Sequence, residues 1–376
     1  MEIARAIVAA GGRALVASAG GRMEARLQAE GGELVRLPLA SKNPLRMRLN
    51  ASRLKRLARR EGVDLIHARS RAPAWSGLWA ARAIGTPFVT TYHGAYNEQG
   101  RAKRRYNAVM AKGEPVIAVS AFIAEMIQQR YGTPPERIRT IPRGADLSQF
   151  SQEAVMPDRI AELVTRWGIE DESRPIFMLP GRLTRWKGQE VFVDACAILR
   201  ERRGPCFLGL MVGGAGTNAE YAAALDRRIL AANVGDCARM TGACSDMPAA
   251  YLLSDCVVSA STDPEAFGRV AVEAQAMARP VLASDHGGAR ETVEHAVTGL
   301  LVPPGDATAL ADAMEEFLDL TEEEHLAVTR AARERAATLF SIERMQEATL
   351  DVYEQATGLR FPRRLSRDAP PSMLGA

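Results

Sequence analysis

Residues 256–284 read CVVSASTDPEAFGRVAVEAQAMARPVLAS, and this stretch decides the fold. The apolar runs at 256–261 and 280–284 are typical of buried strands, and the segment between them has the pattern of a loop followed by a helix. Strands that are joined through a helix lie parallel in one sheet, with the helix on its face. The stretch therefore predicts one βαβ unit of an α/β domain.

The same alternation of apolar runs and amphipathic segments continues on both sides of this unit. In the second half, the other strand-like runs cover 175–180, 207–212, 237–242 and 299–303. In the first half they cover 14–19, 63–68, 87–93, 115–120 and 137–142, with helical patterns over 45–61, 73–84 and 121–131. We expect two doubly wound, Rossmann-like domains that face each other across a cleft, where ligands bind beyond the carboxyl ends of the strands.

A polar segment over 146–173 has no clear strand pattern, so the domain boundary is expected there. We expect a first domain over 1–150 and a second over 151–340. A last helix over 341–358 is expected to pack back towards the first domain. The tail over 359–376 is rich in Pro and Arg and is expected to be disordered.

The composition is that of a globular protein, with 376 residues, 47% hydrophobic and 25% charged, which excludes disordered and fibrous classes. The five cysteines include no CxxC pair, which argues against a disulfide framework and a zinc site. No apolar run reaches the about 18 residues of a membrane-spanning helix, and the N-terminus lacks the order of a signal peptide. We expect a cytoplasmic protein.

The formal charge is divided unevenly along the chain. Residues 1–150 carry 25 Lys and Arg against 11 Asp and Glu, a net of +14, whereas residues 151–376 carry 23 against 34, a net of −11. A basic half of this kind suggests an anionic neighbour: a phospholipid surface, a phosphorylated acceptor or nucleic acid. Soluble Arg-rich helices without any partner explain the same charge.

Two carboxylates in the central unit are separated by seven residues. Glu265 falls in the loop after the strand, and Glu273 lies about two turns along the following helix. Glu265 is placed to accept hydrogen bonds from sugar hydroxyls, while the amides of Phe267 and Gly268 at the helix start donate to a sugar or phosphate. Glu273 would then bind a ribose diol. An acidic helix start followed by an ordinary surface glutamate explains the same spacing.

A second motif follows the strand at 175–180. Arg182 and Lys187 lie in a loop with a glycine at each end, just before a helix over 189–203. Two cations ahead of a helix start suit a diphosphate, and in a transfer reaction they would stabilise the charge that builds on the leaving phosphate. Most basic loops are solvated surface, so this motif indicates a diphosphate site only in combination with the glutamate pair Glu265 and Glu273.

Together, GRLTRWKGQE at 181–190 and PEAFGRVAVEAQAMARPVLASDHGGARETV at 264–293 resemble family 4 of the retaining GT-B glycosyltransferases, whose hallmark is a pair of glutamates separated by seven residues. The resemblance covers nearly the whole chain. It implies a GT-B fold, an acceptor side in the first domain and a nucleotide-sugar site in the second. The donor-binding residues it implies are Arg182, Lys187, Gly242, Glu265, Phe267, Gly268, Glu273, Gly287 and Gly288.

Within that set the resemblance assigns the diphosphate to Arg182 and Lys187, the sugar to Glu265 and the ribose to Glu273. The loop 241–246 would border the base. His93 ends the strand at 87–93, where the family has a histidine beside the reacting carbon. We expect His93 to contact the donor sugar and to stabilise an oxocarbenium-like state, and we count it as catalytic with Glu265, Arg182 and Lys187. A histidine at a strand end is otherwise more often a structural hydrogen-bonding residue.

The resemblance fails at the N-terminus. Members of this family begin with a strand and a Gly-rich loop ahead of the first helix, but residues 2–10 already read as that helix. The first strand is therefore absent from the expected fold, either because the start codon is miscalled or because the chain is complete and impaired.

Basic residues gather in two segments of the first domain, an amphipathic helix over 42–60 and a cluster after His93. Such segments bind anionic lipid at about 1 kcal/mol per charge. Leucines that pack on the sheet, with arginines in water, give the same pattern. No aromatic platform accompanies the charges, so nucleic acid is not expected. The residues expected to contact a membrane or an acceptor are Arg46, Arg48, Arg53, Lys55, Arg56, Arg59, Arg60, Lys103, Arg104 and Arg105.

The stretch HARSRAPAW at 67–75 is similar to glycosyltransferases of lipopolysaccharide core assembly. We therefore expect a retaining transferase that moves a hexose-type sugar to a membrane-associated glycolipid or oligosaccharide acceptor, in lipopolysaccharide core or envelope polysaccharide synthesis. It would work in the cytoplasm or peripherally on the cytoplasmic face of the inner membrane. No DxD pair stands out that would hold a metal with the diphosphate, so no metal and no cofactor are expected.

Other interpretations stay open. A dehydrogenase would use Gly214 and Gly216 with Asp236, but Asp236 precedes its strand instead of ending one. A nucleotide-sugar epimerase or a phosphorylase shares the GT-B fold, although the glutamate pair favours transfer. An inactive, membrane-bound scaffold is the non-enzymatic alternative.

Overall fold

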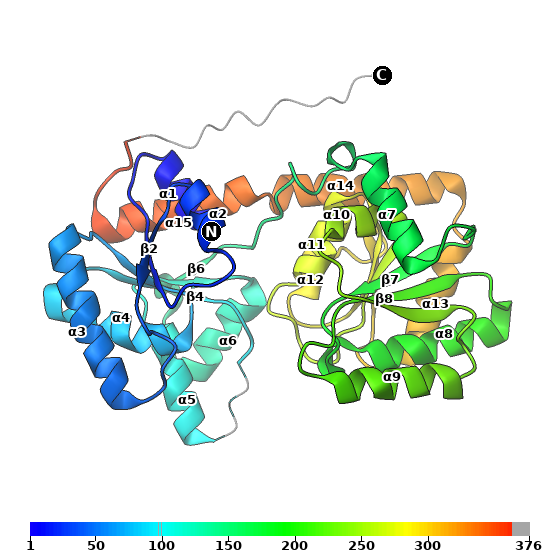
Figure 1. The fold of residues 1–376 in the computed structure, drawn as a ribbon, viewed down its shortest axis with the longest axis horizontal. Helices are drawn as coiled ribbons and strands as arrows, with labels where there is room; N and C mark the ends of the chain where they lie inside the picture. Colours follow the sequence, from blue (N-terminus) through cyan, green and yellow to red (C-terminus); the bar gives the residue numbers. More distant parts are fainter. Residues whose placement is uncertain (97, 99, 363–376) are drawn as a thin grey trace. The chain divides into compact units, whose positions relative to one another are not determined.

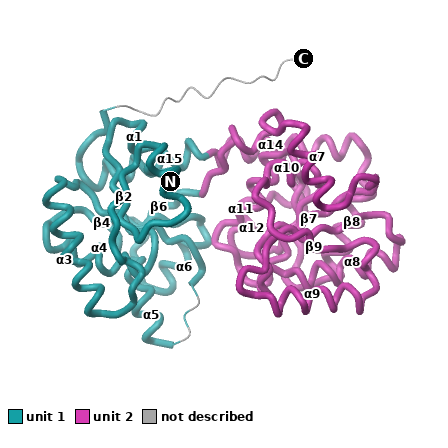
Figure 2. The backbone as a smooth tube through the Cα atoms, in the orientation of Figure 1, with its two compact units in different colours: residues 1–142, 342–376 teal, residues 143–341 magenta. Residues whose placement is uncertain are grey.

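The computed structural model of the chain describes residues 1–96, 98 and 100–362. These residues form two compact units, drawn in different colours in Figure 2. Among the described residues, unit 1 contains 1–142 together with 342–362, and unit 2 contains Arg143–Ser341. The last helix of the chain therefore belongs to the first unit.

Unit 1 has parallel strands in two sheets among its described residues. One sheet has the order β3-β4-β5-β6, and the other pairs β1 with β2. The bounds are β1 (Leu15–Ser18), β2 (Glu33–Arg36), β3 (Ile66–Ala68), β4 (Phe88–Tyr92), β5 (Val116–Ala118) and β6 (Ile138–Thr140). Every strand expected from the sequence is confirmed. β2 is an additional strand, which the pattern did not indicate because its sequence, ELVR, has only two apolar residues.

The helices of unit 1 include both ends of the described chain. Figure 1 shows α15, near the red end of the colour scale, beside α1 at the blue end, and these two helices pack together. They share one apolar core with the sheet, which includes Ile3, Val89, Ile117, Ile342 and Leu350. The bounds are α1 (Glu2–Ala9), α2 (Glu24–Ala29), α3 (Pro44–Glu61), α4 (Arg71–Ile84), α5 (Arg101–Asn107), α6 (Ala121–Tyr131) and α15 (Ile342–Thr357).

Unit 2 has a single parallel sheet in the order β12-β11-β10-β7-β8-β9. Each strand lies in an apolar run that the sequence predicted: β7 (Ile176–Pro180), β8 (Leu208–Val212), β9 (Ala238–Gly242), β10 (Cys256–Ser259), β11 (Val281–Ser284) and β12 (Gly299–Val302). The chain runs from β7 outwards to β9 and then returns to β10 on the other side of β7. This is a doubly wound sheet, with its topological switch point between β7 and β10.

The helices of unit 2 cover this sheet, and its core contains fully buried Phe177, Phe192, Cys196 and Phe207. Their bounds are α7 (Pro157–Trp167), α8 (Gln189–Arg203), α9 (Ala219–Ala231), α10 (Met247–Leu253), α11 (Arg269–Ala276), α12 (Ala289–Thr292), α13 (Ala307–Leu318) and α14 (Glu322–Leu339). The polar segment 146–173, where the domain boundary was expected, contains α7. The expected tail lies outside the described residues from position 363 on.

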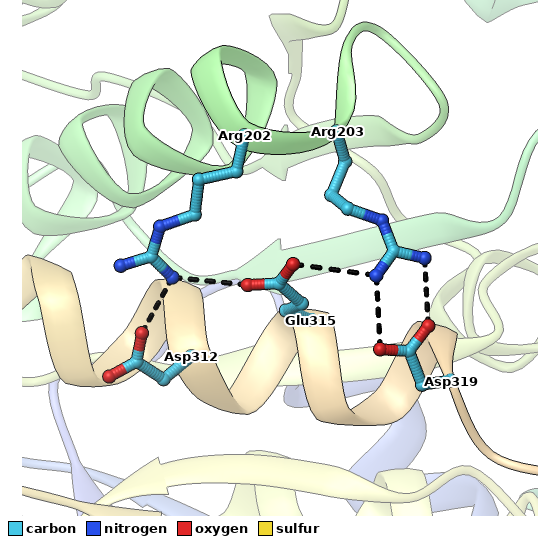
Figure 3. Close-up of polar contacts among 5 residues, drawn as sticks. All are labelled: Arg202, Arg203, Asp312, Glu315 and Asp319. Carbon is cyan, nitrogen blue, oxygen red and sulfur yellow. Dashed lines mark hydrogen bonds and ion pairs between the residues drawn. The ribbon is translucent and has the colours of Figure 1, made fainter.

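A charged network joins α8 to α13 at the surface of unit 2. Figure 3 shows Arg202 and Arg203 on α8 reaching Asp312, Glu315 and Asp319 around α13. Arg203 Nη2 lies 2.7 Å from Asp319 Oδ1, and Arg202 Nη1 lies 2.6 Å from Asp312 Oδ1. These charged side chains are partly exposed, so solvent screens the ion pairs and they add little stability. The buried apolar contacts between α8 and α13 hold the two helices together.

Candidate active site

The two sequence motifs of unit 2 begin at the switch point of its sheet. β7 ends at Pro180 and β10 ends at Ser259, and these two strands are neighbours. The loop 181–188 follows β7 and the loop 260–268 follows β10, so both leave from the carboxyl edge of the sheet. Ligands of doubly wound sheets bind at this position, because the connections on either side run in opposite directions and leave a crevice.

Lys187 and Glu265 form an ion pair between these two loops. Lys187 ends the short 3-10 helix η4 (Arg185–Lys187), and its Nζ lies 2.6 Å from Glu265 Oε1. Both side chains are only 14% exposed, so the pair is largely shielded from water. Ser261 Oγ donates to the same Oε1 at 2.7 Å. The structure thus brings together two residues that the sequence assigned to different parts of the donor.

Glycines allow these loops to approach so closely. A Cβ on Gly188 would lie 1.8 Å from Ala260 O, and a Cβ on Gly287 would lie 2.6 Å from Glu265 O. A Cβ on Gly288 would lie 2.4 Å from Phe267 Cα, and its amide donates to Glu265 O at 2.8 Å. Gly287 and Gly288 therefore support the Glu265 loop through backbone packing. Their nearness to donor phosphates stays a prediction.

Glu273 lies on α11, and two side chains bind its carboxylate. Tyr251 Oη donates to Oε2 at 3.2 Å, and Arg269 Nη2 donates to Oε1 at 2.5 Å. The residue is 9% exposed, so it is not the ordinary surface glutamate that the spacing alone allowed. Tyr251 was not among the expected site residues, because its contact depends on how α10 packs and not on any local spacing.

The other expected donor residues of unit 2 lie on the same edge of the sheet. Gly242 ends β9 with a φ of +79°. Phe267 and Gly268 directly precede α11, and the Phe267 ring packs on Phe340 with ring centroids 5.6 Å apart. Arg182 has an exposed side chain, for which the described part of the chain offers no hydrogen-bond or ion-pair partner. Its guanidinium is therefore available to an anionic ligand.

His93 follows β4 in unit 1 and lies beside Arg69. Arg69 Nε donates to His93 Nε2 at 3.2 Å. An arginine N–H is always a donor, so Nε2 is the acceptor, and a neutral His93 ring carries its proton on Nδ1. Arg69 follows β3, which pairs with β4, so both residues lie at the carboxyl edge of this sheet. Sequence reasoning missed Arg69, although its place directly after a neighbouring strand was a usable signal.

The basic residues of α3 and α5 are largely exposed. α3 buries Met47, Asn50, Ala51 and Ala58, whereas most of the expected arginines face solvent. Leu45 is 75% exposed and Leu49 is 53% exposed, so these two leucines do not pack on the sheet. Lys103, Arg104 and Arg105 are exposed on α5. The exposed side of α3 is thus both basic and apolar.

The position of Asp236 argues against the dinucleotide site of a dehydrogenase. It precedes β9 at the amino end of that strand, and its Oδ1 accepts from Arg200 Nε at 2.9 Å. An acid that binds a dinucleotide ribose lies beyond the carboxyl end of a strand. Among the residues described, no group of three or more His, Cys, Asp or Glu is arranged to hold a metal ion. No described helix is long and apolar enough to cross a membrane.

Two family matches together cover most of the chain. Residues 166–335 match the family described as Glycosyl transferases group 1, and residues 1–149 match Glycosyltransferase Family 4. A D-inositol 3-phosphate glycosyltransferase of Paenarthrobacter aurescens (strain TC1) is 30% identical over 320 residues, which cover 80% of this chain and 75% of that protein.

Solved structures share the fold of the chain. A glycosyltransferase from Rickettsia africae ESF-5 superposes with a TM-score of 0.87 and 32% identity, covering 94% of this chain and 93% of that one. Anabaena HepE in complex with UDP-glucose superposes with a TM-score of 0.80 at 24% identity, covering 95% and 94% of the two chains. The fold is therefore the GT-B fold of the glycosyltransferases. The chain belongs to the group 1 glycosyltransferase family and is a transferase of sugars.

Proposed function

We propose that the chain is a retaining glycosyltransferase that moves a hexose from a nucleoside diphosphate sugar onto an acceptor hydroxyl. The ion pair of Lys187 with Glu265 carries this proposal. It places a cation suited to the leaving diphosphate next to a carboxylate suited to sugar hydroxyls, at the switch point of the sheet. The bond that breaks, between the anomeric carbon and a phosphate oxygen, would lie beside this pair, with the phosphate on the Lys187 side and the sugar on the Glu265 side.

The other expected site residues at the carboxyl edge of the unit 2 sheet bind the remaining parts of the donor in this proposal. Arg182 joins Lys187 on the diphosphate, and the amides of Phe267 and Gly268 donate to the sugar or its phosphate. Glu273 accepts hydrogen bonds from the ribose diol. The loop 241–246, with Gly242, borders the base.

Bond breaking precedes bond making in this scheme. The bond from the anomeric carbon to the phosphate oxygen breaks, and the nucleoside diphosphate leaves with the bonding electrons. The acceptor oxygen then adds on the same face, and its proton passes to the departing phosphate. His93 stabilises the oxocarbenium-like state. Arg182 and Lys187 supply the positive charge that the leaving group needs, so we expect transfer to persist in EDTA.

The first experiment measures release of nucleoside diphosphate from UDP-, GDP- and ADP-hexoses, with Glu265→Ala as the inactive variant. Turnover of one donor that is lost in Glu265→Ala supports the proposal, and NMR of the product's anomeric proton tests retention. An epimerase would change the sugar nucleotide without releasing a nucleoside diphosphate. A scaffold would leave every donor intact. Either result contradicts the proposal.

We propose that the acceptor is a lipid-linked glycan of lipopolysaccharide core or envelope polysaccharide synthesis, reached at the cytoplasmic face of the inner membrane. The exposed side of α3 supports this acceptor, because Leu45 and Leu49 are exposed among its arginines. An amphipathic basic helix of this kind lies in an anionic lipid surface with its apolar residues inserted.

Vesicle sedimentation tests the membrane contact. We expect binding to vesicles that contain phosphatidylglycerol but not to pure phosphatidylcholine, and loss of binding when Arg48, Arg53, Arg56 and Arg59 are changed to Gln. The matched control is Arg227→Gln with Arg330→Gln, because both arginines are exposed on helices of the acidic unit 2. Equal binding by the wild type to both vesicles would contradict the membrane acceptor.

A phosphorylated polyol is the second candidate acceptor. It is favoured by the name of the Paenarthrobacter aurescens relative, a D-inositol 3-phosphate glycosyltransferase at 30% identity. The donor assay separates the two candidates, because inositol phosphate would raise the release of nucleoside diphosphate without any lipid present.

A further inference from the structure

Tyr251 is a fully buried tyrosine that contacts the carboxylate of Glu273. It lies on α10, and its Oη donates to Glu273 Oε2 at 3.2 Å. Burial raises the pKa of Tyr251 well above its ordinary value, and the charge of Glu273 raises it further. The phenol therefore stays protonated at neutral pH and is the donor of this hydrogen bond.

The carboxylate of Glu273 keeps one acceptor position on each oxygen. Tyr251 occupies one position on Oε2, and Arg269 Nη2 occupies one on Oε1 at 2.5 Å. Each carboxylate oxygen accepts two hydrogen bonds, so each retains a free lone pair. Two acceptors side by side match the two donors of a vicinal diol, provided that the plane of the carboxylate is held in one orientation.

α10 is itself anchored at the end of the loop 241–246. Asp246 caps the helix by accepting from Ala249 N at 3.2 Å. Arg159 on α7 donates to both oxygens of Asp246, at 2.6 and 2.7 Å. At the other end of α10, the ring of Phe150 packs on Tyr251 with centroids 6.1 Å apart. One short helix thus connects the loop 241–246 to the carboxylate of Glu273.

We propose that Tyr251 is a positioning residue for the donor ribose, which orients the Glu273 carboxylate towards the 2′- and 3′-hydroxyls. Because α10 begins at the loop 241–246 and carries Tyr251, this one helix fixes both the loop that borders the base and the carboxylate that binds the ribose. The inference rests on the proposed assignment of Glu273 to the ribose. It adds the residue that makes this carboxylate selective for a diol.

The test compares the affinity of the full chain for UDP with its affinity for 2′-deoxy-UDP, by calorimetry, with the guanine and adenine pairs run alongside. We expect the wild type to prefer the ribonucleotide, and Tyr251→Phe to lower this preference about threefold to tenfold, the size of an ordinary hydrogen bond, because the carboxylate still keeps its bond from Arg269. Affinity for the deoxynucleotide should barely change. Tyr221→Phe is the control, because that buried hydroxyl contacts Gln189 instead.

Three outcomes overturn the inference, and they are distinguishable. If Tyr251→Phe keeps its melting temperature and the full ribose preference, Tyr251 does not position the carboxylate. If it weakens both nucleotides equally, its role is structural only. If the wild type shows no ribose preference and Glu273→Gln changes nothing, the assignment of Glu273 in the proposed function fails as well.

Discussion

Lys187 and Glu265 show how a single contact ties the two motifs of the site together. Lys187→Met removes the charge but keeps most of the apolar side chain. We expect kcat to fall by about 10²- to 10³-fold, because the charge on the leaving diphosphate is largest in the transition state. The donor KM should change much less. Steady-state kinetics with the donor that the panel identifies measures both constants.

Arg185→Met is the matched control for this prediction. Arg185 lies in the same short helix, but its side chain is 77% exposed and pairs with Glu190 at 3.2 Å. We expect kcat to change by less than about twofold, as is usual for an exposed ion pair. A Lys187→Met variant with a raised donor KM and an unchanged kcat would show that Lys187 binds the ground state and the transition state equally.

Gly188 shows what the close approach of two loops requires of one residue. Its φ is +74°, and a Cβ there would lie 1.8 Å from Ala260 O, so Gly188→Ala combines backbone strain with a backbone clash. Gly168→Ala is the comparison, since Gly168 has a φ of +62° and no atom near its would-be Cβ. We expect a cost of about 1 kcal/mol at Gly168 and a clearly larger one at Gly188. Urea unfolding midpoints measure both, and equal midpoints would show that the loop moves freely.

At the scale of elements, a buried histidine joins α15 to the sheet of unit 1. His67 on β3 bonds Tyr353 Oη through Nδ1 at 2.6 Å and Thr91 Oγ1 through Nε2 at 2.7 Å. Burial lowers the pKa of His67 well below its ordinary value, and the charges of Arg69 and His93 lower it further. The folded protein therefore holds this ring neutral between two hydroxyl groups.

This neutral ring predicts a loss of stability in acid. The unfolded chain takes up a proton at His67 as the pH falls below about 6.5, whereas the folded chain does not, so stability is present above this pH and is lost below it. We expect the melting temperature of His67→Gln to fall less than that of the wild type between pH 7.5 and pH 5.5. His295→Gln removes an exposed histidine and serves as the control. Parallel pH curves for the wild type and His67→Gln would contradict the prediction.

The local sequence pattern predicts the strands of this chain wherever their residues are mostly apolar. Every expected strand is present, and β4, β7 and β8 are the clearest cases, since all their residues are buried in parallel sheets and their sequences are mostly apolar. β2 and α2 were not predicted because they have only four and six residues, and half of the residues in each are polar. The leucines of α3 also could not be placed, since only the packed structure separates exposed Leu45 and Leu49 from the buried side of the helix.

The residues of the candidate site also fall into those that the sequence predicted and those that it did not. Residue types and spacing predicted Lys187, Glu265 and Glu273, because each follows a strand at a recognisable distance. Ser261 and Tyr251, which donate to Glu265 and Glu273, were not predicted, and neither was Arg69, which donates to His93. The contacts of Ser261 and Tyr251 depend on which loops and helices meet in the folded chain, and no periodicity along the sequence encodes them. For Arg69 the position directly after β3 was a usable signal.

At the scale of the whole molecule, the chain enters and leaves unit 2 at one place. Ala145 N donates to Phe340 O at 2.8 Å, and Ala145 pairs with Ser341, so the two crossings lie side by side. Unit 2 is continuous from Arg143 to Ser341 and contains its own sheet. Unit 1 needs residues from both ends of the chain, because Ile342 and Leu350 complete the core around Val89 and Ile117.

This connectivity predicts that each unit can be produced alone, unit 2 as one continuous segment and unit 1 as two segments that must be joined. Residues 143–341 alone should fold and bind the donor nucleotide, because Lys187, Glu265 and Glu273 all lie within them, but they should transfer no sugar without His93 in unit 1.

Residues 1–142 alone should fold poorly. Joining them to 342–362 through a short Gly-Ser linker should restore a cooperative transition, since the two crossings are adjacent. Circular dichroism melts measure the folding of the three fragments, calorimetry measures nucleotide binding, and the release of nucleoside diphosphate measures transfer. Transfer by residues 143–341 alone would remove His93 from the reaction, whereas folding of 1–142 alone would show that α15 is dispensable for the core of unit 1.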